Sequence, residues 1–191
     1  MKPDAVIVDN LVSPISFKDL EALAPLLVDV PLVAVICGQT YLPKIISMLC
    51  KHLKYRWVLS YDASTHHNSA NKIVTHWQPV ILFGEPLKEI DDVIRDKTEL
   101  IEKLTKPGDL IFNHEGYSSL FVEAIKKERR YVSCHEDSNT VEKWEKDFFN
   151  DLNKWIDETL KNGSTGKNNI TVTKTGKMTA VNFREGRKDS N

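Results

Sequence analysis

Cysteine is scarce in this chain, with only Cys37, Cys50 and Cys134 among 191 residues, and no two of them form a Cys-x-x-Cys pair. Three isolated cysteines cannot build a disulfide framework or a cysteine-based zinc site, which favours a reducing, intracellular and cytoplasmic setting. Long apolar runs are also missing: none approaches the roughly 18 residues that cross a bilayer. The first residues lack the apolar segment of a signal peptide. We therefore expect no membrane partner.

The chain also has no large excess of charge of either sign, because it contains 26 Lys and Arg residues and 27 Asp and Glu residues, for a net charge of −1. This balance excludes a protein built mainly to coat nucleic acid or an anionic membrane. The average hides two unlike parts. From residue 161 onward seven basic residues against two acidic ones give +5, which leaves −6 for residues 1–160. The composition predicts one domain over 1–160 and a basic, flexible tail over 161–191.

Short apolar runs alternate with longer amphipathic segments along the first 160 residues. The runs with the composition of buried strands are 5–8, 32–37, 55–61, 79–83, 110–112 and 131–134. The segments between them predict helices that begin near residues 16, 42, 87, 118 and 140, with 87–104 helical in two pieces. This alternation predicts an α/β fold: a doubly wound, mostly parallel sheet of about six or seven strands with helices on both faces. A ligand crevice would lie at the carboxyl ends of the strands.

Two segments depart from this alternation. Residues 62–76 form the longest polar break in the body, and breaks of this length inside a compact domain usually form functional or mobile loops. After a linker-like composition at 162–166, the runs 170–173 and 178–181 alternate around a Lys-Thr-Gly-Lys turn, a weak hairpin signal. A lone hairpin is marginal in water, so it would need to dock on the body or on a partner.

Residues 106–137 are the most informative segment, with a strand, a polar turn with one glycine, a helix, a second strand and an acidic end. Such a βαβ unit can hold a nucleoside, although ordinary units without a ligand are common. The segment resembles the cofactor region of S-adenosylmethionine-dependent DNA methyltransferases that modify adenine-N6 or cytosine-N4. The frame matches at Pro107-Gly108-Asp109, at the strand 110–112 and at Arg129-Arg130. Residues 38–63 and 76–86 resemble the middle of such enzymes, in the permuted order that places the catalytic strand first.

The resemblance implies S-adenosylmethionine as cofactor, bound by Asn113, Glu115, Gly116 and Glu136. The family's loop begins with Asp and contains several glycines that let the backbone approach the cofactor. Here the loop begins with Asn113, only Gly116 remains of the glycines, and Tyr117 adds a bulky side chain. These changes predict that cofactor binding is weakened or lost.

The resemblance also places the catalytic motif, Asp/Asn-Pro-Pro-aromatic in the family, at Asp9-Asn10-Leu11-Val12. In the family the oxygens of this motif bind the target amino group while the aromatic ring stacks on the flipped base. Asp9 keeps the acid, but both prolines and the aromatic residue are replaced. Asp9 is thus the candidate catalytic residue, with a loop anchor as the simpler alternative.

DNA is the partner that the resemblance implies, and basic or polar side chains outside the catalytic motif are candidates to contact it. His66, His67 and Lys72 lie in the 62–76 break, which would face DNA. The tail supplies the basic residues Lys174, Lys177, Arg184, Arg187 and Lys188. No metal is predicted, because the histidines have no acidic or cysteine partner at ligand spacing.

Three hypotheses follow from these residues. The first is a methyltransferase-like protein, catalytically impaired or inactive, that serves as a nucleic-acid or protein binding module. In this hypothesis the protein binds DNA, and is then associated with the nucleoid, or it binds an active methyltransferase subunit or a second copy of itself. The second is an active, divergent adenine-N6 or cytosine-N4 DNA methyltransferase. The third is a nucleotide-binding α/β protein that shares only ancestry with the family.

Overall fold

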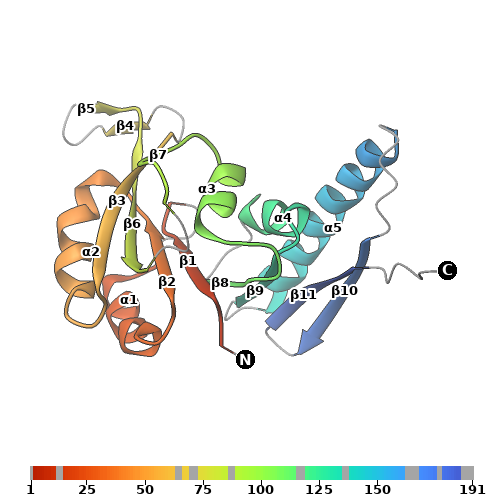
Figure 1. Cartoon of the computed structure of the whole chain (residues 1–191), viewed down its shortest axis with the longest axis horizontal. Coiled ribbons are helices and arrows are strands. Elements are labelled where there is room, and N and C mark those ends of the chain that lie inside the picture. The colour runs from red at the N-terminus through yellow and green to blue at the C-terminus, as the bar shows by residue number, and fades with distance from the viewer. Residues whose placement is uncertain are drawn as a thin grey trace.

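A nine-stranded sheet forms the centre of the computed structural model, with strand order β10-β11-β9-β8-β1-β2-β6-β3-β7 (Figure 1). The structure describes residues 2–11, 15–62, 66–68, 73–85, 89–114, 119–134, 138–161, 168–175 and 178–185. The six predicted strands are β1 (Ala5–Asp9), β2 (Leu32–Ile36), β3 (Tyr55–Tyr61), β6 (Gln78–Gly84), β8 (Leu110–His114) and β9 (Arg130–Cys134). The strands β9, β8, β1 and β2 are parallel, and β6 runs antiparallel between β2 and β3.

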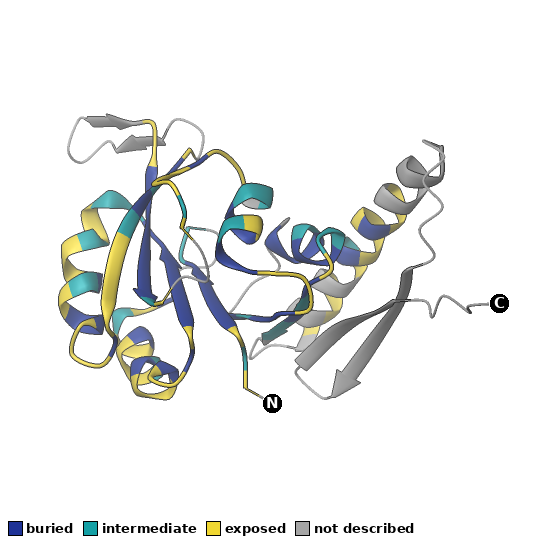
Figure 2. Cartoon of the chain, viewed as in Figure 1, coloured by how far each residue is buried: buried dark blue, intermediate teal, exposed yellow. Residues whose placement is uncertain are grey.

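Helices cover both faces of the sheet, as the apolar pattern predicts. One face is covered by α1 (Phe17–Leu23), the short 3-10 helix η1 (Ala24–Leu27) and α2 (Leu42–Leu49), which is preceded by η2 (Gln39–Tyr41). The other face is covered by α3 (Lys97–Leu104), α4 (Ser119–Lys126) and α5 (Ser138–Lys161). The central strand β1 divides its side chains between these layers, because successive residues point to opposite faces. Ala5 and Ile7 pack under α3, α4 and α5, whereas Val6 and Val8 pack under α1 and α2. Figure 2 shows the central strands buried. The doubly wound fold is confirmed.

The expected helix over 87–104 is wrong in its first half. Residues Val93–Ile94 form the short strand β7, which pairs in parallel with β3, and the helix begins only at Lys97. Asp96 sets that start, because its side chain accepts a hydrogen bond of 2.8 Å from the Glu99 N–H and caps the helix. The sequence pattern alone does not show the free edge of β3 that recruits β7.

The polar break over 62–76 contains a small hairpin of β4 (His66–Asn68) and β5 (Ile73–Thr75). It forms a separate two-stranded sheet. The break is therefore partly ordered by its own backbone hydrogen bonds.

A second hairpin extends the main sheet beyond β9. It comprises β10 (Asn168–Thr175) and β11 (Met178–Glu185), and β11 pairs antiparallel with β9 from Met178 opposite Cys134 to Val181 opposite Tyr131. This docking onto the body covers the β9 edge. The division of the chain at residue 160 stays a prediction.

Candidate functional site

The candidate site lies at the carboxyl edge of the parallel strands, where Asp9 ends β1. Asp9 is buried and pairs with Ile36 of β2. Asn113, near the end of the adjacent strand β8, is fully buried and lies opposite Ile7 on one side and Ser133 on the other. The fold thus brings the predicted catalytic residue and the first predicted cofactor residue onto neighbouring strands at one edge. Their roles stay predictions.

The turn after β1 uses its polar side chains to bind its own backbone. Asp9 accepts a hydrogen bond of 3.3 Å from the Leu11 N–H through Oδ1, and Asn10 Oδ1 accepts one of 2.6 Å from the Ile15 N–H. The Asn10 N–H donates to the Ile36 carbonyl at 3.0 Å. Leu11 is half-buried against the core beneath α3 and α4. Side chains of this kind close a turn on itself, which is the loop-anchor arrangement.

The remaining predicted cofactor residues cannot be placed. Glu115, Gly116 and Glu136 lie outside the residues that the structure describes, and so does Tyr117. The end of β8 therefore supplies Asn113 as the one cofactor candidate with a described position.

The basic pair that matches the family frame has a structural function. The Arg129 guanidinium is buried and donates to the Thr105 carbonyl at 2.7 Å and to Thr105 Oγ1 at 3.0 Å. Burial lowers the pKa of Arg129, and the nearby Asp109 opposes that shift. Arg130 donates from Nε to the Gly108 carbonyl at 2.9 Å. These bonds tie the turn before β8 to the start of β9, so this part of the frame positions strands and does not itself reach the carboxyl edge.

Two polar residues at the same edge were not found from the sequence. Tyr61 ends β3, and burial together with the nearby Asp9, Asp96 and Asp62 carboxylates raises its pKa. Gln78 begins β6 directly opposite Tyr61 and is buried, and its Oε1 has no hydrogen-bond partner within the described part of the chain. The signal for Gln78 was weak: a single amide between Trp77 and Pro79, ahead of an apolar run.

Cys37 follows β2 at this edge and is fully buried. Burial raises the pKa of its thiol to about 12. A thiol of this kind carries almost no thiolate at neutral pH, so Cys37 is unsuited to be a nucleophile.

The predicted nucleic-acid residues do not gather on one surface. The backbones of His66 and His67 lie in β4, whereas Lys174 lies in β10 and Arg184 in β11. Figure 1 shows the β4–β5 hairpin and the β10–β11 hairpin at opposite ends of the molecule. Lys174 pairs with Thr179 and Arg184 with Asn169, so these two positions fall on opposite faces of the sheet. The other candidates, Lys72, Lys177, Arg187 and Lys188, lie outside the described residues.

The residues that the structure describes contain no group of three or more His, Cys, Asp or Glu side chains arranged to hold a metal ion. No helix among them combines the length and the apolar character required to span a membrane.

Comparison with known proteins gives a match in structure only. No protein-family model matches the chain, and no curated protein sequence matches it. The DNA methyltransferase M1.HpyAVI superposes with a TM-score of 0.60 at 17% identity, over 76% of this chain and 87% of that one. Its complex with S-adenosylmethionine gives 0.59 at 14% identity, over 78% and 89%.

A second protein supports the same conclusion. TTHA0409 from Thermus thermophilus, named as a candidate DNA modification methylase, matches in its S-adenosylmethionine complex with a TM-score of 0.58 at 10% identity. The match covers 78% of this chain and 87% of that one. Identities this low establish the architecture alone. The chain has the Rossmann-like fold of the DNA methyltransferases.

Proposed function

We propose that this protein is a methyltransferase-fold binding module that does not transfer methyl groups. The observation that carries the proposal is the turn after β1, where Asp9 and Asn10 bind the backbone of their own loop and Leu11 packs into the core. The family uses this turn to hold and stack a target base. A turn that binds its own backbone offers less to such a base, and neither Leu11 nor Val12 can stack on it.

Loss of this positioning has a large expected effect on the reaction. Methyl transfer requires the amino group and the methyl donor to be held together, and positioning of this kind corresponds to effective molarities on the order of 10⁵ M or more. An acid at a strand end without a stacking partner retains little of that contribution. Asp9 therefore serves in this proposal as a loop anchor.

The residues described at the cofactor position fit S-adenosylmethionine poorly. This cofactor supplies the methyl group when an enzyme of the family binds it, and M1.HpyAVI and TTHA0409 are both known in complex with it. Asn113 has none of its surface exposed, so its side chain is not presented to a ligand. The single glycine of the loop leaves less room for close backbone approach than the family's several glycines. We propose that cofactor binding is weak or lost.

One observation favours the alternative of an active, divergent DNA amino-methyltransferase. Asp9 and Asn113 lie on adjacent parallel strands at one edge, and the resemblance assigns the catalytic motif to the first and the cofactor loop to the second. In that case Asp9 would orient the target amine, and Asn113, Glu115, Gly116 and Glu136 would hold the cofactor.

A methyl-transfer assay separates these two functions. The full chain, mixed-sequence DNA and S-adenosylmethionine with a tritiated methyl group should give no incorporation above a protein-free control. An active methyltransferase assayed on the same DNA provides the positive control. Incorporation that disappears in Asp9→Ala would establish the active alternative. Micromolar binding of S-adenosylmethionine in calorimetry would contradict the proposed loss of the cofactor site.

The partners that we propose are DNA, an active methyltransferase subunit or a second copy of the chain. DNA binding by the C-terminal hairpin has a measurable signature, because each lost phosphate contact lowers the salt dependence of the binding constant by about 0.9 in log–log slope. Of Lys174→Gln and Arg184→Gln, made singly, the variant on the face that contacts DNA should reduce that slope by about 0.9 and the other should leave it unchanged. The single variants show which face of the hairpin contacts DNA.

Substitution is the appropriate test here, because deletion of residues 162–191 would also expose the β9 edge that β11 covers. The matched control is Lys18→Gln with Lys106→Gln, which removes the same charge from exposed positions elsewhere. Equal slopes for the hairpin and control variants would eliminate the hairpin as a DNA-binding arm.

A further inference from the structure

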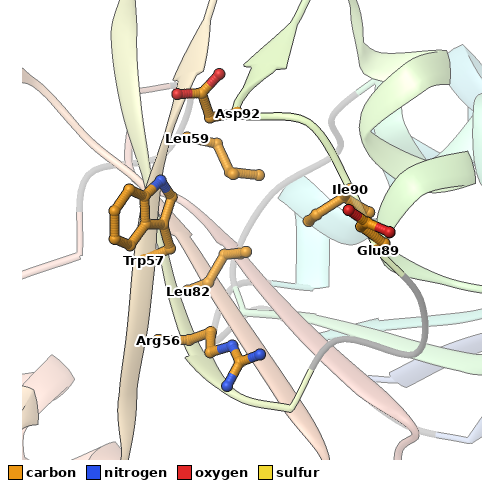
Figure 3. A pocket seen from close by; sticks show the side chains of 7 residues that line it. All are labelled: Arg56, Trp57, Leu59, Leu82, Glu89, Ile90 and Asp92. Atoms are coloured by element: carbon orange, nitrogen blue, oxygen red, sulfur yellow. The ribbon is translucent and has the colours of Figure 1, made fainter.

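A cavity of about 250 Å³ opens beside β3 and β6 (Figure 3). Its base is apolar and consists of Leu59, Leu82 and Ile90. Leu59 and Leu82 are almost fully buried, so they are fixed parts of the sheet. Trp57, which pairs with Leu82 across the two strands, forms one wall and leaves 57% of its surface exposed. An exposed indole beside an apolar base offers a ligand both a ring face and an apolar surface to cover.

The cavity and the candidate site lie on different strands of the sheet. Trp57 and Leu59 belong to β3, and Leu82 belongs to β6, where it pairs with Ala34 in the middle of β2. Two strands, β2 and β6, lie between β3 and the strand β1 that carries Asp9. The cavity is therefore displaced sideways along the sheet from Asp9, and its proposal does not rest on the proposed function.

The charges around the cavity are unequally compensated. Arg56 is paired, since its Nη1 lies 3.2 Å from Glu85 Oε2, and Lys54 Nζ contacts the same carboxylate at 2.5 Å. Glu89 and Asp92 also line the cavity, and neither side chain has a hydrogen bond or ion pair with any described residue. Asp91, between them, is bonded to Lys103 at 2.8 Å instead. The rim thus presents two carboxylates without a partner among the described residues, beside an arginine that shares the Glu85 carboxylate with Lys54.

We propose that this cavity binds an organic cation, an alkylammonium or guanidinium group with a short apolar body. Tryptophan is the aromatic residue that attracts cations most strongly through its ring face. The carboxylates of Glu89 and Asp92 supply the opposite charge, and Leu59, Leu82 and Ile90 accommodate the apolar body. The volume lies below the roughly 300–1,000 Å³ of drug-sized sites, which suits one amine or one basic side chain.

Trp57 provides the readout in the full-length protein. Nuclear magnetic resonance of the ¹⁵N-labelled chain resolves the indole N–H signals of its four tryptophans, and Trp57→Phe identifies the relevant one. Titration with butylguanidinium or butylammonium should move the Trp57 signal saturably, with a dissociation constant of about 1 mM. N-butylurea, which is neutral and of similar shape, should bind at least about ten times more weakly. Equal binding of N-butylurea, or no saturable shift with the cations, would overturn the proposal.

The carboxylates are tested by neutralising both of them. Glu89→Gln with Asp92→Asn should weaken cation binding at least about fivefold, and both residues are exposed, so the fold is retained. The matched control, Asp29→Asn with Glu142→Gln, removes the same charge from exposed positions elsewhere and should leave binding unchanged. If both double variants weaken cation binding equally, the effect is general electrostatics and the proposed site is refuted.

A further ligand, N-acetylarginine N-methylamide, distinguishes an arginine side chain of a protein from a free organic cation. Binding as tight as that of butylguanidinium indicates a protein side chain, and weaker binding indicates a free cation.

Discussion

Replacing Gly84 with alanine is expected to lower the free energy of unfolding by about 3 kcal/mol or more. Gly84 ends β6 with a φ of +88°, and an added Cβ would lie 2.2 Å from the backbone oxygen of Pro31. That contact cannot relax cheaply, because the Glu85 N–H binds the same oxygen at 3.0 Å and the Gly84 N–H binds the Lys54 carbonyl at 2.8 Å. A clash here separates β6 from both β2 and β3, so the whole side of the sheet that carries Gln78, Tyr61 and the cavity is affected.

Gly108 offers a matched control for this variant. Its φ of +86° is nearly the same, but an added Cβ would meet nothing within 4 Å. Gly108→Ala should therefore show the backbone strain alone, about 1 kcal/mol. Urea unfolding of both variants measures the difference, and thermal unfolding should place Gly84→Ala roughly 6 °C or more below wild type. Equal losses would show that the close approach to Pro31 is not what requires glycine.

Alkylation of Cys37 in the folded protein should be slower than that of an ordinary exposed thiol by about 10³-fold or more at pH 8. A thiol with the usual pKa near 8.5 is roughly a quarter ionised at that pH. The Cys37 thiol, with its pKa raised to about 12 by burial, is ionised to only about one part in 10⁴. Iodoacetamide must also reach a side chain that has no exposed surface, which slows the reaction further.

Peptide mass spectrometry after timed labelling measures this directly, with the exposed Cys50 as the internal control. Cys50 should be modified first, and Cys37 should become reactive when the chain is unfolded in guanidinium chloride. Labelling of Cys37 at the rate of Cys50 in the folded chain would show that the thiol is accessible and ionisable. A nucleophilic role at the carboxyl edge would then have to be reconsidered.

The order of the elements followed from the sequence because it depends on local patterns. Continuous apolar runs such as Ala5–Val8 and Leu32–Cys37 favour buried central strands, and the amphipathic segments between them favour helices that cover the faces. The same reasoning identified the edge at which Asp9 and Asn113 meet, since parallel strands bring their carboxyl ends together. The family resemblance added the roles of these two residues, which remain predictions.

Edge contacts and the closure of loops were decided by the tertiary structure. Val93–Ile94 forms a strand because β3 offers an unpaired edge there, and β11 docks because β9 offers another. No periodicity in either segment encodes its partner. Likewise, the sequence names Asp9 and Asn10 but does not show that both bind their own turn, or that Gln78 lies opposite Tyr61.

The cavity beside Trp57 shows most clearly what the sequence determines and what the tertiary structure determines. The sequence by itself predicted a strand that contains Trp57 and a later one that contains Leu82, but it predicted the first as buried, whereas the start of β3 is exposed. Only the tertiary structure decided that these strands are antiparallel neighbours and that Glu89 and Asp92 return to their rim. The physical reason is range: strand and helix patterns depend on residues a few positions apart, whereas a cavity depends on segments that meet only when the chain has folded.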